Sequence, residues 1–171
     1  MTYDEKRAEI SNLDTWEADA AHAVEMIEPH LVYGGTVLDF GCGVGRIMKP
    51  LAKKHNRTQF IGVDIDEDAL AYARAGARKN ESYYIDGSIN DVRSLYSVIT
   101  FQHMSDEEVR DVIKWAHPAL LRFQFAVGDI QMPYNYQRSP ENVEAWCYEA
   151  GYKVEMSEDP IEPTWRWVTA K

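Results

Sequence analysis

The hydrophobic positions of this chain follow two different periods. Between residues 14 and 31, apolar side chains recur every three or four positions, which predicts a helix. Seven short apolar runs predict strands, at residues 36–40, 59–64, 82–85, 95–101, 120–127, 153–156 and 165–169. Further helical patterns lie between most of these runs and begin near Arg46, Asp66, Ser105 and Ser139.

This alternation of strands and helices predicts a doubly wound α/β fold, in which helices cover both faces of a mostly parallel sheet. The last two strands are separated only by residues 157–163, which is too short for a helical crossover. We therefore expect seven strands with an antiparallel hairpin at the C-terminal end. A length of 171 residues suits one domain, with a helical segment at 1–31 and a core at 32–171.

Charge and composition exclude several classes of partner. The chain has 28 acidic and 18 basic residues and a net charge of −10, whereas proteins that bind phosphate backbones usually present a basic face. We expect no nucleic-acid partner. No apolar run approaches the roughly 20 residues of a membrane-spanning helix, and the first residues lack a secretion signal. We therefore expect a cytoplasmic protein without a membrane partner.

The two cysteines, Cys42 and Cys147, are far apart in the sequence and have no histidine at metal-ligand spacing. We expect neither a disulfide nor a metal site.

The most informative segment is residues 37–46, with the sequence Val-Leu-Asp-Phe-Gly-Cys-Gly-Val-Gly-Arg. Its glycines allow backbone N–H groups to approach a ligand closely. A dinucleotide site would need a further glycine at position 46, where Arg46 stands. The carboxylate of Asp39, just before the glycines, would repel an anion and would attract an ammonium or sulfonium group.

A second carboxylate follows the next predicted strand. Asp64 occupies the position from which a carboxylate accepts hydrogen bonds from both hydroxyls of a ribose. The two motifs together favour a nucleoside with a cationic, phosphate-free tail, and S-adenosylmethionine fits that description. They disfavour a nicotinamide dinucleotide.

Three segments resemble one known family. Residues 37–46 resemble the cofactor motif of class I S-adenosylmethionine-dependent methyltransferases, and residues 60–66 resemble their second motif. Residues 96–104 are similar to the fourth strand and following turn of the small-molecule branch. The resemblance covers about residues 30–170 and implies a Rossmann-like fold with S-adenosylmethionine as cofactor.

The resemblance also assigns residues to the cofactor. Those implied around its methionine part are Asp39, Gly41, Cys42, Gly43, Thr100 and Gln102. Those implied around its ribose and adenine are Asp64, Ile65, Asp86 and Ser88. A small residue filling a tight turn is the alternative interpretation of Cys42, and we favour it over a nucleophile.

The residues that act on the methyl acceptor are harder to identify. Methyl transfer from a sulfonium needs mainly alignment, and it needs a base only when the acceptor must lose a proton. His103 is the candidate base, and a helix-entry residue bonded to backbone is the equally good alternative. Tyr134, Tyr136 and Arg138 follow the fifth strand and are candidate acceptor-binding residues, with a solvated loop as the alternative.

The acceptor class follows from the turn after the fourth strand. It reads Phe-Gln-His-Met at 101–104, whereas DNA amino-methyltransferases usually carry Asn/Asp-Pro-Pro-aromatic there. We expect transfer to an O or N atom of a small organic molecule. A methyltransferase acting on a protein, and a non-catalytic S-adenosylmethionine-binding or interaction module, remain open. Arg122 and Gln124 share one face of a predicted buried strand, which the pattern does not explain.

Overall fold

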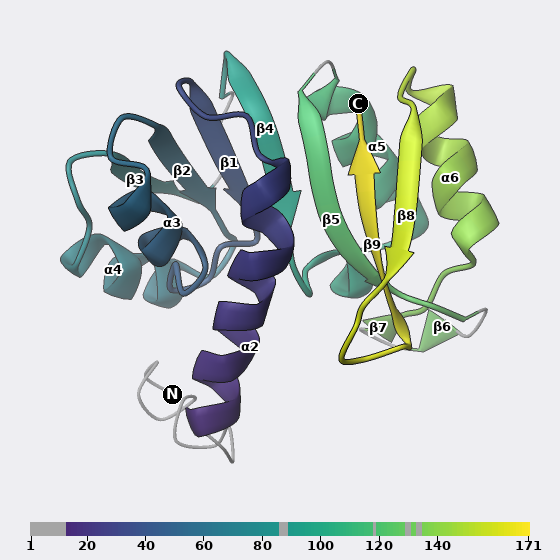
Figure 1. The fold of residues 1–171 in the computed structure, drawn as a ribbon, viewed down its shortest axis with the longest axis horizontal. Coiled ribbons are helices and arrows are strands. Elements are labelled where there is room, and N and C mark those ends of the chain that lie inside the picture. The colour runs from purple at the N-terminus through teal and green to yellow at the C-terminus, as the bar shows by residue number, and fades with distance from the viewer. Residues whose placement is uncertain (1–12, 86–88, 118, 129–130, 133–134) are drawn as a thin grey trace. The chain divides into compact units, whose positions relative to one another are not determined.

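The structure, a computed structural model, describes residues 13–85, 89–117, 119–128, 131–132 and 135–171 (Figure 1). The chain forms two compact units, Met1–Asp91 and Val92–Lys171. The seven strands and their helices confirm the predicted α/β class, with a mostly parallel sheet and an antiparallel C-terminal hairpin.

The first unit contains three parallel strands in the order β3-β2-β1. Its elements are α2 (Leu13–Ile27), the 3-10 helix η1 (Glu28–His30), β1 (Thr36–Phe40), α3 (Met48–Lys54), β2 (Gln59–Val63), α4 (Glu67–Ala75) and β3 (Glu81–Tyr84). The fully buried side chains of this unit include Val37, Leu38, Leu51, Phe60 and Leu70. These residues come from β1, α3, β2 and α4, so the apolar runs identified in the sequence form the core.

The predicted helix over 14–31 ends earlier than expected. The α-helix stops at Ile27 and a 3-10 turn follows, with Pro29 at its start. Proline has no N–H group to donate to the preceding turn, so the α-helical pattern cannot continue through it. The Glu28 carboxylate then binds Lys54 Nζ at 2.7 Å and His55 Nε2 at 2.6 Å, which holds the turn against the end of α3. The hydrogen bond from Lys54 lowers the pKa of Glu28, against the opposing effect of burial.

In the second unit, four strands of the main sheet follow the order β4-β5-β9-β8, and β6 pairs with β7 in a separate two-stranded sheet. Its elements are β4 (Val92–Ser97), the 3-10 helix η2 (Phe101–His103), α5 (Asp106–Ala116), β5 (Leu120–Ala126), β6 (Gln131–Met132), β7 (Asn135–Tyr136), α6 (Pro140–Glu149), β8 (Val154–Glu158) and β9 (Trp165–Ala170). Strands β4 and β5 are parallel, and β9 pairs antiparallel with both β5 and β8. In Figure 1, α6 lies beside α5 and β8.

The fourth strand differs from its predicted range of 95–101. It spans Val92–Ser97, and the backbone of Ile99 has a φ of 64°, in the left-handed region. A β-branched residue rarely adopts this conformation, and an extended strand cannot contain it. The chain therefore leaves the sheet before Ile99 and turns into η2.

Three of the four predicted helix starts are confirmed by their caps, whereas the helix expected from Arg46 begins at Met48 without a side-chain cap. Ser105 and Glu108 form a capping box at the start of α5. Ser139 accepts a hydrogen bond from the N–H of Asn142, and Pro140 is the first residue of α6. Asp66 caps α4 by accepting from two backbone N–H groups.

The polar pair on the fifth strand also has an explanation. Arg122 donates to Thr169 Oγ1 at 2.9 Å, and its guanidinium lies 4.8 Å from the centre of the Trp167 ring. Gln124 donates to Asp159 Oδ2 at 3.4 Å. Both partners come from β9 or the β8–β9 turn, so the antiparallel hairpin supplies the hydrogen bonds of these two side chains. Burial lowers the pKa of Arg122 to about 10.

Asp159 is the centre of this buried polar face, and its removal tests the arrangement. Its Oδ1 accepts from the N–H groups of Ile161 and Glu162, and its Oδ2 also accepts from Trp167 Nε1 at 2.7 Å. Asp159→Ala leaves these donors without a partner, so we expect the free energy of unfolding to fall by about 2–4 kcal/mol in urea denaturation.

The neighbouring Glu158 provides the control for this prediction. Its ion pair with Arg166 is exposed, so Glu158→Ala should cost at most about 1 kcal/mol. Equal losses in the two variants would contradict the role given to Asp159.

Candidate cofactor and acceptor site

The glycine-rich segment forms a tight loop between β1 and α3. Gly41, Gly43 and Gly45 have φ values of 79°, 50° and 75°, a region in which side chains are strained. The N–H groups of Gly41 and Cys42 donate to the carbonyl of Val63 at 2.8 and 3.0 Å. The loop is thereby held to the carboxyl end of β2, where the second motif begins.

Asp64 completes this connection with its side chain. Its Oδ2 accepts from the N–H of Gly43 at 2.7 Å, and its Oδ1 accepts from the N–H of Asp66 at 2.9 Å. A carboxylate can accept about four hydrogen bonds, so capacity remains for the two hydroxyls of a ribose. The two residues that the sequence assigned to different parts of one ligand, Gly43 and Asp64, are in direct contact.

Cys42 packs beneath the loop and is buried. Burial raises the pKa of its thiol, followed in importance by the negative charges of Asp39 and Asp64, so the reactive thiolate is disfavoured. A Cβ atom added at Gly62 would lie 2.7 Å from Cys42 Sγ, which shows how closely the two residues pack. These contacts favour the interpretation of Cys42 as a small residue filling a tight turn.

The glycines of this unit face different surroundings. A Cβ atom at Gly45 would lie 2.6 Å from the hydroxyl of Tyr83, which itself donates to Glu81 at 3.0 Å. A Cβ atom at Gly43 would meet no atom within 4 Å. Gly45 is therefore required by packing, whereas the side of Gly43 is open to a ligand. Sequence reasoning missed Tyr83 and Glu81, because nothing in the local pattern of β3 connects them with the loop.

The remaining predicted cofactor residues of this unit differ in exposure. Asp39 is buried on β1, and Ile65 is 93 % exposed after β2. Tyr84 and Ile85, at the end of β3, are also exposed. An apolar surface at the ends of β2 and β3 is what an adenine ring would need, and the role of Ile65 there stays a prediction. Asp86 and Ser88 lie outside the described residues.

In the second unit, Thr100, Gln102 and His103 belong to the turn that contains η2. Gln102 is buried, and its Nε2 lies 3.1 Å from Nε2 of the exposed His103 ring. An amide nitrogen can only donate, so in this contact the ring Nε2 is the acceptor. The strained Ile99 precedes the turn. Such strain costs about 1–3 kcal/mol and gathers at functional sites, so Ile99 is a signal that sequence reasoning could not find.

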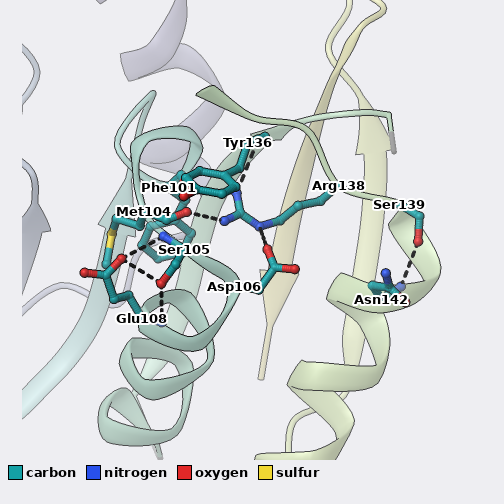
Figure 2. A network of polar contacts seen from close by, with 9 residues as sticks. All are labelled: Phe101, Met104, Ser105, Asp106, Glu108, Tyr136, Arg138, Ser139 and Asn142. Atoms are coloured by element: carbon teal, nitrogen blue, oxygen red, sulfur yellow. Dashed lines mark hydrogen bonds and ion pairs between the residues drawn. The ribbon is translucent and has the colours of Figure 1, made fainter. Parts of the chain in front are cut away.

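The candidate acceptor residues have unequal surroundings. Tyr136 is partly exposed, and Tyr134 lies outside the described residues. The side chain of Arg138 is only 2 % exposed and contacts Asp106 and the carbonyls of Phe101, Met104 and Tyr136, as Figure 2 shows. Direct contact of Arg138 with an acceptor stays a prediction, and these contacts give its guanidinium protein partners.

Two features are absent from the described part of the chain. Within it, no cluster of His, Cys, Asp and Glu side chains could hold a metal ion. No described helix is long and apolar enough to cross a membrane.

Comparison with known proteins identifies relatives of this chain. Among curated proteins, the ribosomal protein L11 methyltransferase of Thermotoga petrophila is 42% identical over 59 residues, which is 34% of this chain. That of Cupriavidus taiwanensis is 35% identical over 71 residues, or 40% of this chain. The chain spans 22% and 24% of the length of these two relatives.

Solved structures show the same fold along most of the chain. An S-adenosylmethionine-dependent methyltransferase from Archaeoglobus fulgidus has a TM-score of 0.74 and 14% identity, covering 91% of this chain and 93% of its own. One from Aquifex aeolicus has a TM-score of 0.71 and 21% identity, covering 97% and 96%. Residues 37–123 match the family described as "Methyltransferase domain". The chain, with its glycine loop joined to Asp64, therefore belongs to the class I S-adenosylmethionine-dependent methyltransferases.

Proposed function

We propose that this protein transfers a methyl group from S-adenosylmethionine to an O or N atom of a small organic acceptor in the cytoplasm. The observation that carries the cofactor assignment is the hydrogen bond between the Asp64 carboxylate and the Gly43 N–H, at 2.7 Å. It joins a carboxylate suited to a ribose diol with a loop whose open side can take the cationic tail. The net charge of −10 disfavours nucleic acid as the acceptor.

Methyl transfer from S-adenosylmethionine requires little from the protein beyond alignment of the reacting groups. Bound S-adenosylmethionine supplies an already activated methyl group. In our proposal, Asp64 and the glycine loop hold the ribose and methionine parts, and the buried Asp39 contributes negative charge near the methionine amino group. Gln102 and His103 orient the reacting groups, and alignment of this kind accounts for most of the catalysis.

A protein acceptor is the second candidate, because the curated relatives that match this chain are named ribosomal protein L11 methyltransferases. Transfer of a labelled methyl group separates the two. We expect label in one or more members of a panel of small phenols, amines and acids, and none in ribosomal protein. Label in protein alone would overturn the small-molecule proposal, and no turnover with any acceptor would favour a non-catalytic binding module.

The open side of Gly43 leads to a matched pair of variants. Gly43 and Gly34 both have positive φ, and an added Cβ meets nothing within 4 Å at either position. Each Gly→Ala change should therefore lower the free energy of unfolding by about 1–2 kcal/mol, the cost of a left-handed residue. Calorimetry should show at least a roughly tenfold loss of S-adenosylmethionine affinity in Gly43→Ala alone. A similar change in Gly34→Ala would mean that backbone strain, not ligand contact, causes it.

The ribose assignment is tested at Asp64. Asp64→Asn keeps the side-chain shape but removes the charge and one acceptor oxygen, so we expect a loss of about 1.5–3 kcal/mol in binding of S-adenosylmethionine. Asp68→Asn, on the first turn of α4, is the control and should bind normally. Unchanged affinity in Asp64→Asn would remove the ribose assignment.

The role of His103 is tested by turnover. Because Gln102 already occupies Nε2 of the ring, we expect His103 to orient rather than to accept a proton. His103→Gln should then reduce turnover by less than about a hundredfold, the lower end of the range for losing a general base. His117→Gln, an exposed histidine after α5, serves as the control. A larger loss with cofactor affinity intact would assign His103 as the base.

A further inference from the structure

We propose that Arg138 is a positioning residue of this methyltransferase, which acts by holding the turn Thr100–Met104 in place rather than by contacting the acceptor. The inference rests on the proposed function, since that turn carries Thr100, Gln102 and His103.

The side chain of Arg138 donates hydrogen bonds to both ends of the turn. Its Nη1 donates to the carbonyl of Phe101 at 2.8 Å, and its Nη2 donates to the carbonyl of Met104 (Figure 2). These two carbonyls lie on either side of Gln102 and His103 in the chain. One rigid, planar guanidinium therefore sets the distance between the two ends of the turn.

The same side chain is anchored to α5. Its Nε donates to Asp106 Oδ1 at 3.0 Å, and Asp106 is the first residue of that helix. The capping box of Ser105 and Glu108 holds the helix start from the other side. The turn is therefore fixed relative to a helix whose own beginning is well defined.

The backbone of Arg138 is fixed as firmly as its side chain. Its N–H donates to the carbonyl of Ala126 at 2.9 Å, and its carbonyl accepts from the N–H of Gly128 at 3.1 Å. These two backbone bonds pair Arg138 with the end of β5. They therefore fix the position at which the chain, after leaving β5, returns to it before α6 begins. Arg138 thus joins the segment after β5, which carries Tyr136, to the turn after β4.

The presence of an arginine rather than a lysine at position 138 supports a positioning role. Burial lowers the pKa of Arg138 and the charge of Asp106 opposes this, so the buried guanidinium carries a desolvation cost. The Asp106 side chain is 37 % exposed, so this ion pair is only partly buried, and its clearest use is to specify one arrangement of the turn. Only the forked donors of arginine reach two carbonyls and a carboxylate together, because lysine presents its charge at a single nitrogen.

The first measurement is amide hydrogen exchange in Arg138→Met, Arg138→Lys and the parent protein. The N–H groups of His103 and Met104 donate to the carbonyls of Thr100 and Phe101, so they report directly on the turn. We expect exchange at these two amides to rise about tenfold or more in both variants, while amides of β5 are unchanged. A uniform rise throughout Val92–Lys171 would show general destabilisation and would overturn the proposal.

Arg166→Met is the matched control. Arg166 also donates to two carbonyls, those of Pro163 and Trp165, and to a carboxylate, that of Glu158. It lies in the β8–β9 hairpin, so its loss should leave exchange at His103 and Met104 unchanged. If Arg138→Met fails to fold, Arg138→Lys provides the test, because it keeps the charge and loses only the forked arrangement of N–H donors.

The second measurement compares two ligands by calorimetry. The turn is assigned to the methionine part of the cofactor, so both Arg138 variants should bind S-adenosylhomocysteine about tenfold more weakly and adenosine, which lacks that part, equally well. Unchanged affinity for S-adenosylhomocysteine would overturn the positioning role, whether or not the turn exchanges faster. Failure of the parent protein to bind S-adenosylhomocysteine would instead overturn the proposed function.

Discussion

The first unit depends on the hydrogen bonds that hold the glycine loop against the end of β2. Val63 accepts from Gly41 and Cys42, and Asp64 accepts from Gly43. These contacts let a loop of left-handed residues adopt one defined path, although each glycine loses more conformational entropy than other residues would. The parallel pairing of β1 with β2 makes this possible, because it brings the carboxyl ends of both strands to the same edge.

The loop is also supported by side chains that pack against its glycines. Cys42 fills the space next to Gly62, and the Tyr83 hydroxyl, held by Glu81, lies against Gly45. A larger side chain at either glycine would force the loop away from β2. Packing against neighbouring side chains thus explains the glycines at 45 and 62. The open space beside Gly43, which a ligand can occupy, explains that glycine.

In the second unit, polar groups are buried where the sheet departs from the parallel pattern. The antiparallel strand β9 brings Thr169 and Trp167 to β5, and the turn before it brings Asp159. Buried polar groups of this kind are costly unless each finds a partner. The hairpin is therefore held to β5 by specific hydrogen bonds in addition to apolar contacts, and Arg138 does the same for the connection that leaves β5.

The sequence by itself determined the α/β class, the strand positions to within a few residues, the helix caps and the glycine-rich motif that the resemblance assigns to the cofactor. These features depend on local chemistry: apolar periodicity, capping side chains, and glycines followed by a carboxylate at a fixed spacing. The end of the fourth strand was displaced, because a left-handed β-branched residue such as Ile99 has no clear local pattern. The end of the first helix was placed too late, although Pro29 marks it locally. Tertiary structure alone decided the partners of Arg122 and Arg138. Apart from the bond of Arg138 to the nearby Tyr136 carbonyl, their hydrogen bonds join residues 32 to 47 positions apart, and no local pattern specifies which distant oxygen a buried guanidinium will meet.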